Sequence, residues 1–516
     1  MRLTVADRLA LLTGRGVTLG GLAERLATIH GDRRMVEEAS PDRGDPSRLH
    51  LTFPRAAERV RELSGAIAGR AGRGDRVVLA LPNGYELILA VLAASRAGAI
   101  PVPLNAELTP AEVDLVAADS GASLLVRDLD ELPVPRRADR HEPAPADPGD
   151  VGAIFYTSGT TGRPKGVRLT HRALLSDLRP AALWPGRLHR DEAVFGLPVS
   201  HIMGFIAVLG MAVAGIPVYF LPRFRPDAAL DAIEQRRATI FVGVPAMYRL
   251  MAEAGAEARD LRSVRVWASG ADAMPAELAR RFQRLGATAT LPLPLPGLGR
   301  NLGEAAFLEG YGMVETGGGV AFKAALPLLR LLPGEALGVP IPPNRLRVVG
   351  EDGRDVAAGQ VGELWVKGPG VLEGYHGDES ATAEVVTSDG WLRTGDMARK
   401  GAFGLVHFAG RGKDVIKRGG YSVYAVEVEG VLEQHPGVAE AAVVGLPDER
   451  SGEAPCAAIR RAPGSDVDAE ELAAWARERM AAFKVPVRFL FVDELPRTGT
   501  RKVRREEVKG LFGAPA

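Results

Sequence analysis

The sequence predicts an α/β protein whose large N-terminal domain is built on doubly wound, mostly parallel sheets. Two observations carry this prediction. Short apolar runs alternate with stretches of helical periodicity, and the first set forms a βαβ unit: a strand at 77–81, a helix at 85–97 and a strand at 100–104. The chain also has 516 residues, more than one ordinary hydrophobic core supports, so we expect at least two domains.

The same alternation continues through the middle of the chain, which favours a sheet with helices on both faces. Strands are expected at 194–197, 239–242 and 264–268, and helices at 227–236 and 275–285. The segment 291–301 (LPLPLPGLGRN) matches neither helix nor strand, and we expect it to be an insertion close to the functional site.

The pattern changes in the last third of the chain. Short strands separated by glycine turns predict a small β-barrel-like subdomain at about 335–411, which completes a large domain spanning 1–411. Residues 412–516 predict a small α+β domain with strands at 439–444, 455–459 and 489–492. Its helix is expected to open at Asp468, with Glu471 as the capping partner.

Composition excludes several classes of function. Lys plus Arg equals Asp plus Glu at 64 each, so nothing indicates nucleic acid or an anionic membrane as a partner. The single cysteine, Cys456, excludes an internal disulfide and a multi-cysteine metal site. The N-terminus lacks the apolar length of a signal peptide, and we expect a cytoplasmic protein.

One uncharged stretch, 202–221, has about the length of a membrane span. Gly210, Gly215 and Pro217 divide it, which favours a buried helix followed by a strand at 218–221. We therefore expect no transmembrane segment.

The stretch YTSGTTGRPKG, residues 156–166, predicts a phosphate-binding loop. It follows a short apolar run expected to be a buried strand, and it combines hydroxyl groups, glycines that let backbone amides approach an anion, and a lysine. The Walker pattern does not fit, because Pro164 stands where that loop would begin its helix. The expected phosphate-binding residues are Thr157, Ser158, Gly159, Thr160, Thr161, Gly162 and Lys165.

Four further motifs follow this loop in order: GYGMVE (310–315), GWLRTGD (390–396), GRGKDVIKRGG (410–420) and LPRTGTRKV (495–503). With the phosphate loop, they resemble the adenylate-forming acyl-CoA synthetases over about residues 74–508. The resemblance implies an AMP-forming acid–thiol ligase that uses ATP, Mg²⁺ and coenzyme A. It also implies that the C-terminal domain is mobile and rotates between the two half-reactions.

The resemblance assigns catalytic and nucleotide-binding roles. Lys502 would be the adenylation lysine, Glu315 the acid near Mg²⁺, and Tyr311 the adenine stacking partner, while Asp396 and Arg411 would hold the ribose hydroxyls. The AMP site would also include Gly270, Ala271, Asp272, Gly310, Gly312, Met313 and Val314.

The acyl pocket would be formed by His201, Gly204, Phe205, Gly270, Gly317 and Gly318. His201 has two interpretations, a pocket residue or a core or helix-capping histidine. No aspartate follows HIMGF at 201–205, whereas amino-acid-activating relatives carry one, so we expect a carboxylic acid without an α-amino group. Lys417, Gly419 and Gly420 would serve the CoA half-reaction, with Lys413 as the hinge.

Three positions depart from the family pattern: Val314 replaces a threonine, Arg501 a glycine and Ala425 a proline. The leading hypothesis is activation of a hydrophobic carboxylic acid, either a fatty acid or a bulky cyclic acid, and its transfer to CoA. The alternatives are transfer to a carrier-protein thiol or partner enzyme, a non-catalytic adenylate-binding protein, and a luciferase-like oxygenase. A homodimer is compatible with the sequence.

Overall fold

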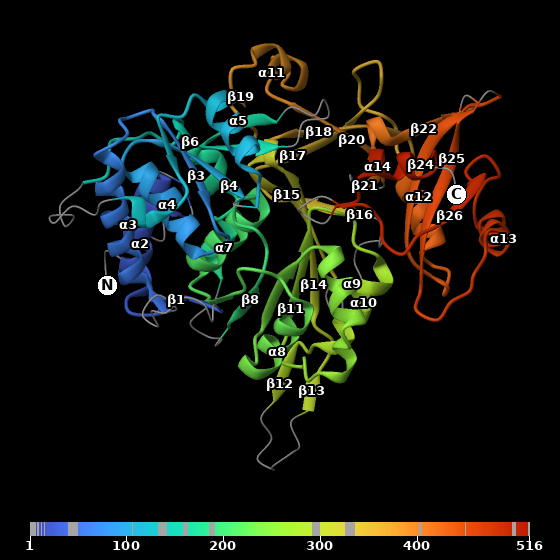
Figure 1. The fold of residues 1–516 in the computed structure, drawn as a ribbon, viewed down its shortest axis with the longest axis horizontal. Helices are drawn as coiled ribbons and strands as arrows, with labels where there is room; N and C mark the ends of the chain where they lie inside the picture. The colour runs from blue at the N-terminus through green and yellow to red at the C-terminus, as the bar shows by residue number, and fades with distance from the viewer. Residues whose placement is uncertain are drawn as a thin grey trace. The chain divides into compact units, whose positions relative to one another are not determined.

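A computed structural model describes residues 7, 10–11, 13–14, 16–39, 50–105, 107–132, 142–157, 164–184, 191–291, 300–325, 336–401, 405–419, 421–448, 450–497 and 502–513. The chain divides into two compact units (Figure 1). Unit 1 comprises Met1–Gly334, Gly338–Arg345 and Val366–Leu392, and unit 2 comprises Glu335–Leu337, Leu346–Trp365 and Arg393–Ala516.

Unit 1 contains a largely parallel sheet in the strand order β14-β11-β10-β8-β9-β1-β2, which confirms the predicted fold class. Only β2 pairs antiparallel within this run, and β15 and β16 extend it antiparallel beyond β14. The strands are β1 Arg34–Glu38, β2 His50–Thr52, β8 Ala193–Phe195, β9 Val218–Phe220, β10 Ile240–Gly243, β11 Val266–Gly270, β14 Ala306–Met313, β15 Gly318–Ala325 and β16 Ala336–Pro340.

Helices connect these strands, and α7, α8 and α10 lie where the sequence predicted helices, whereas α6 and α9 were not predicted. The helices are α6 His171–Ser176, α7 Ile202–Ala214, α8 Pro226–Arg236, α9 Pro245–Glu253 and α10 Ala276–Leu285, with 3₁₀ turns at η4 Pro180–Leu183, η5 Ala256–Ala258 and η6 Val314–Thr316. The buried aromatic side chains of Phe241, Tyr248, Trp267 and Phe282 contact one another edge to face between the sheet, α9 and α10.

A second parallel sheet, in the order β4-β3-β5, contains the βαβ unit expected from the sequence. The elements are α2 Leu19–His30, α3 Phe53–Ala68, β3 Arg76–Leu81, α4 Tyr85–Arg96, β4 Ile100–Asn105, α5 Pro110–Ser120, β5 Leu124–Val126 and η2 Leu129–Glu131. The helix α4 is apolar on every side because α2 and α3 cover the face that does not meet the sheet, so nearly all its residues are buried.

The uncharged stretch at 202–221 forms a buried helix and a strand, as predicted. The helix α7 ends at Gly215, which adopts a φ of 70°, and β9 follows within three residues. Among the described residues, no helix is long and apolar enough to span a bilayer.

The structure of the segment 291–301 differs in part from the sequence-based prediction. Its ends form two short strands, β12 Ala289–Leu291 and β13 Arg300–Leu302, which pair antiparallel, so the prediction that no sheet is present is wrong there. This pair precedes the amino end of β14, whereas Glu315 follows its carboxyl end, eight residues of strand away (Figure 1). The described ends therefore do not lie close to the site, because a strand of that length spans roughly 26 Å.

Unit 2 contains a small α+β module, as expected. Its sheet has the order β23-β22-β25-β24, and β26 adds a parallel strand against β25. The elements are β22 Val415–Arg418, β23 Tyr421–Tyr424, α12 Ala425–Leu432, β24 Val438–Asp448, β25 Gly452–Arg461, α13 Ala469–Arg479, β26 Arg488–Phe491 and α14 Arg505–Leu511. The carboxylate of Asp468 accepts a hydrogen bond from the backbone of Glu471, which confirms the predicted helix start.

Four further strands belong to the segment where short strands and glycine turns were predicted. They are β17 Arg345–Val349, β18 Val361–Lys367, β20 Leu392–Lys400 and β21 Val406–Arg411, followed by η8 Gly412–Asp414. The last two pair antiparallel.

Candidate active site

The predicted phosphate loop joins two antiparallel strands of unit 1. These are β6 Val151–Thr157 and β7 Lys165–Thr170, in which Thr157 lies opposite Lys165. Ser158, Gly159, Thr160, Thr161 and Gly162 lie outside the described residues. Lys165 begins a strand, so this loop differs from a Walker loop, as the position of Pro164 indicated.

Tyr375 links the lysine of this loop to the acid expected near Mg²⁺. It ends β19 Gly374–Tyr375, which pairs with β7, and its ring lies 5.0 Å from Nζ of Lys165. Its hydroxyl donates to Oε1 of Glu315 over 3.1 Å. The pKa of Tyr375 is raised, first by burial and then by Glu315, so the hydroxyl stays protonated. The sequence analysis missed Tyr375, although its aromatic side chain between glycines in GYHG (374–377) was a signal.

Glu315 occupies a tight turn after β14, held by backbone contacts. The Thr316 hydroxyl accepts from the backbone of Met313 at 3.0 Å and donates to the carbonyl of Gly318 at 2.8 Å. Any Cβ at Gly312 would lie 1.9 Å from the Gly318 carbonyl oxygen, so only glycine fits. This turn therefore fixes the position of Glu315 just beyond the end of β14.

The predicted adenine and acyl walls lie at the carboxyl ends of β11 and β14. Gly270 lies opposite Gly310 in the parallel pair, and Ala271 continues with a φ of 67°, unusual for a residue with a side chain. A Cβ at Gly270 would lie 3.2 Å from Cε of Met203, the second residue of α7. The structure therefore brings the start of α7 against this sheet edge, where open α/β sheets bind ligands.

Of the residues predicted for the acyl pocket, Gly204 and Phe205 pack against other parts of unit 1. The others lie at the carboxyl end of β11, at the start of α7 or after the Glu315 turn. Gly204 packs against the backbone, since a Cβ there would lie 2.1 Å from the Pro198 carbonyl oxygen, and Phe205 is fully buried against Phe155. This position gives Phe205 a core-packing role in place of the predicted pocket role. His201 occupies the N-cap position of α7, without a side-chain hydrogen bond to the first turn of the helix. Gly317 and Gly318 follow the Glu315 turn.

In unit 2 the two predicted ribose ligands lie side by side. Asp396 on β20 faces Arg411 at the end of β21, and Nε of the guanidinium lies 3.2 Å from Oδ1 of the carboxylate. The Asp396 side chain is 3% exposed and that of Arg411 is 46% exposed. A buried acceptor beside an accessible donor suits a diol, which can bond to both.

Lys502 is half-buried and follows the segment 498–501, which lies outside the described residues. An isolated bridge pairs Arg497 with Val503, the residues on either side of this segment and of Lys502. Arg497 in turn pairs with Glu440, a carboxylate 2% exposed that Arg460 also approaches at 3.6 Å. Lys502 therefore lies next to a bridge that is anchored by an ion pair.

The residues predicted for the thioester step form a partly polar edge. Lys413 lies in η8, Nζ of Lys417 bonds to the Ser422 hydroxyl at 3.0 Å, and Gly419 adopts a φ of 56°. Gly420 lies outside the described residues.

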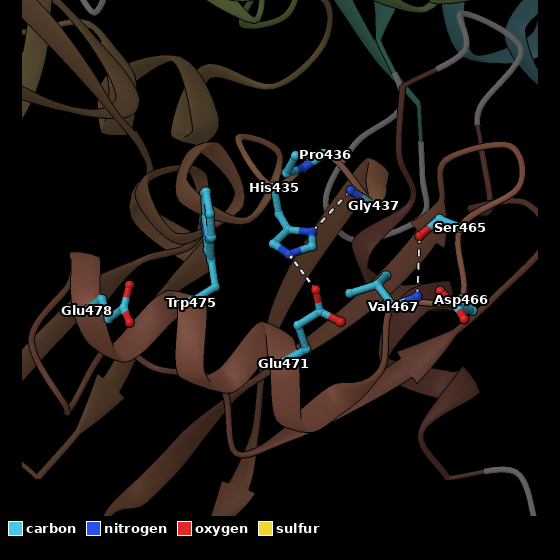
Figure 2. A pocket seen from close by; sticks show the side chains of 9 residues that line it. All are labelled: His435, Pro436, Gly437, Ser465, Asp466, Val467, Glu471, Trp475 and Glu478. Atoms are coloured by element: carbon cyan, nitrogen blue, oxygen red, sulfur yellow. Dashed lines mark hydrogen bonds and ion pairs between the residues drawn. The ribbon is translucent and has the colours of Figure 1, made fainter.

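Figure 2 shows a separate hollow of unit 2, with a volume of about 560 Å³, between His435 and α13. His435 has two partners there: its Nε2 lies 3.2 Å from Oε1 of Glu471, and its Nδ1 accepts a hydrogen bond from the backbone N–H of Gly437. Trp475, which also lines this hollow, packs against Arg479, whose Cζ lies 3.3 Å from the centroid of the Trp475 ring. None of the predicted site residues lines it.

Glu315 suits an ion that also bridges phosphate groups. Mg²⁺ usually takes one or two carboxylates together with substrate phosphates and water. In the described part of the chain, no cluster of three or more histidine, cysteine or acidic side chains could hold a metal alone. The donor set therefore fits Mg²⁺ brought with a nucleotide better than a permanently held metal.

Comparison with known proteins matches both parts of the chain. The model of the AMP-binding enzyme family matches residues 24–376, and that of the AMP-binding enzyme C-terminal domain matches residues 427–502. A feruloyl-CoA synthase of Amycolatopsis sp is 37% identical over 487 residues, covering 90% of this chain and 94% of that protein. An indoleacetate–CoA ligase of Aromatoleum aromaticum is 34% identical over 504 residues, covering 89% and 93%.

Solved structures agree in fold. The o-succinylbenzoate coenzyme A synthetase of Bacillus subtilis, in complex with ATP and a magnesium ion, superposes with a TM-score of 0.79 at 26% identity. The match covers 95% of this chain and 99% of that one.

Proposed function

Since this chain belongs to the AMP-binding enzyme family and is an AMP-forming acid–thiol ligase that uses ATP, Mg²⁺ and CoA, we propose that its substrate is a hydrophobic, ring-bearing carboxylic acid. The observation that carries this choice is the sheet edge where Met203 lies against Gly270. There an apolar helix start meets glycines rather than polar side chains. The relatives named for ferulate, indoleacetate and o-succinylbenzoate support it, because each acid contains a ring.

The reaction has two steps, adenylation of the acid and transfer of the acyl group to CoA. A carboxylate oxygen attacks the α-phosphorus of ATP, and the bond to pyrophosphate breaks. The CoA thiolate then attacks the acyl carbon, a thioester forms, and AMP leaves. Mg²⁺, when bound, offsets charge on the phosphate oxygens.

The first step brings two anions together, so cationic groups aimed at the developing charge make the largest contribution. We assign this role to Lys502 and Lys165. Glu315 would hold the magnesium, Tyr311 would stack on adenine, and Asp396 with Arg411 would hold the ribose. Tyr375 would orient Glu315 through the 3.1 Å hydrogen bond. A rotation of the C-terminal domain about Lys413 would then admit CoA near Lys417 and Gly419.

A panel of ring-bearing and straight-chain acids tests the proposal. We expect acid-dependent pyrophosphate release to be fastest with ring-bearing acids and CoA to be consumed in equal amounts. Faster release with straight-chain fatty acids would overturn the substrate class. Pyrophosphate release without CoA consumption would point instead to a carrier-protein thiol or partner enzyme as acceptor.

A further inference from the structure

Asp177 places a carboxyl group beside the acyl pocket that the proposed function does not use. It follows α6 directly, and a Cβ built on Gly210 of α7 would lie 3.8 Å from Cδ2 of the next residue, Leu178. A Cβ built on Gly318 would lie 2.6 Å from Oδ2 of Asp177 and 3.5 Å from Cγ1 of Ile206. The carboxyl group therefore occupies space that a larger residue at position 318 would fill, between a predicted pocket glycine and the helix of Met203.

The hydrogen-bonding capacity of this carboxyl group is not fully used by the described residues. The side chain is half-buried overall, but its Oδ2 atom is closed off from solvent and has no hydrogen-bond partner among the described residues. Buried polar atoms without partners are uncommon in folded proteins, and each one requires an explanation. A purely structural aspartate would be expected to satisfy both oxygens within the protein.

Burial also favours the uncharged form of this carboxyl group. Burial raises the pKa of Asp177 to about 8, although the backbone N–H of Gly319 and the Ser176 hydroxyl oppose the rise. A neutral carboxyl group both donates and accepts hydrogen bonds, as a hydroxyl group does. The side chain of Ile206, the apolar neighbour of Asp177, can neither donate nor accept a hydrogen bond.

We propose that Asp177 is a specificity-determining residue that forms the polar end of the acyl pocket and selects acids whose ring carries a hydroxyl group or a ring N–H. The inference rests on the proposed function, since it concerns the same pocket. A hydroxylated acid would bond to the unpartnered oxygen, whereas an acid with a methyl group at that position would leave it unsatisfied. Sites that bond a substrate hydroxyl discriminate strongly against analogues that lack it.

The test compares matched acids on the full-length enzyme. Cinnamic acids with hydroxyl or methyl groups at the 3- and 4-positions, together with indoleacetic acid and its N-methyl derivative, are assayed for kcat/KM of pyrophosphate release. We expect at least one hydroxyl or N–H acid to exceed its methyl counterpart by about tenfold or more. Equal values for every pair would overturn the inference and leave the proposed function intact. Failure of all acids would count against the proposed function itself.

Two variants assign the preference to Asp177. Asp177→Leu should abolish or reverse it mainly through KM for the acid, and Asp177→Asn should retain part of it, because the amide still donates and accepts. Asp227→Asn, a change at an exposed aspartate of α8, should leave it unchanged. An unaltered preference in folded Asp177→Leu would contradict the proposal. If that variant does not fold, the matched acids on the wild-type enzyme decide alone.

Discussion

The two units hold their predicted site residues in different ways. In unit 1 the functional side chains contact one another, since Lys165 lies over Tyr375 and Tyr375 bonds to Glu315. In unit 2 Asp396 and Arg411 also contact each other, but Lys502 follows a segment whose flanks are held by the bridge of Arg497 with Val503 and by the ion pair of Arg497 with the buried Glu440. The difference implies that changes in unit 1 alter activity directly, whereas changes beside Lys502 act through stability.

The largest effect is expected at Glu440. Glu440→Gln removes the negative charge that pairs with Arg497 and Arg460, and breaking a buried pair in this way costs roughly 3–5 kcal/mol. The free energy of unfolding, measured by denaturant titration, should fall by that amount. Glu478→Gln, at an exposed position that also pairs with an arginine, should change it little. Equal stability of the two variants would show that the anchor beside Lys502 is not important.

A smaller but purely kinetic effect is expected at Lys502. Lys502→Ala should slow acid-dependent pyrophosphate release on the order of a hundredfold, or roughly 3 kcal/mol, by analogy with loss of one preorganised donor. Its free energy of unfolding should stay near the wild-type value, which separates it from Glu440→Gln. Lys509→Ala provides the matched control, because the ion pair of that lysine among the described residues is with Glu506, on the exposed face of α14. Undiminished adenylation in Lys502→Ala would remove the catalytic assignment.

The same contrast explains what the sequence could predict of the fold. Strands and helices such as β3, α4, α8 and β24 follow from local periodicity and were predicted within one to four residues. The antiparallel partners of the strands that carry the motifs were harder to predict, because strand pairing depends on residues far away in the chain. The pairing of β7 with β19 joins residues about 200 positions apart. The strands β12 and β13 were missed because each has three residues, too few to show strand periodicity, and a Pro/Leu/Gly sequence separates them.

For the site, the sequence located residues that motifs mark, but not the residues that orient them. Asp396 and Arg411 were predicted together and do lie together. Tyr375, Glu440 and Asp177 were not predicted, since each acts through a contact formed only when distant segments pack. Phe205 shows the converse, because its neighbours in the sequence resemble a pocket while its ring is buried in the core.

An intermediate effect is expected at Tyr375. Tyr375→Phe keeps the ring beneath Lys165 but removes the hydrogen bond to Glu315, and bonds to charged groups contribute about 1.5–3 kcal/mol. We expect a loss of about tenfold in adenylation at low Mg²⁺, partly recovered at high Mg²⁺. Tyr375→Leu removes the ring as well and should additionally raise KM for ATP. Identical kinetics for the two variants would show that the ring over Lys165 has no role.

The effect that is smallest at neutral pH concerns His171, which opens α6 directly after β7. Burial lowers the pKa of His171 to about 4, although Asp150 opposes the change, and the neutral ring accepts a hydrogen bond at Nδ1 from the backbone of Leu19 at 3.4 Å. The unfolded chain takes up this proton near pH 6.5 and the folded chain only near pH 4, so the unfolded state binds more protons between these values. Stability should therefore fall as the pH is lowered through this window, by up to about 1.4 kcal/mol per pH unit. In His171→Asn, where the amide oxygen can replace Nδ1 as acceptor, this part of the slope should disappear while stability at pH 7.5 changes less. Denaturant titrations at pH 7.5, 6 and 5 measure the difference, and parallel slopes for the two proteins would show that His171 is not buried in its neutral form.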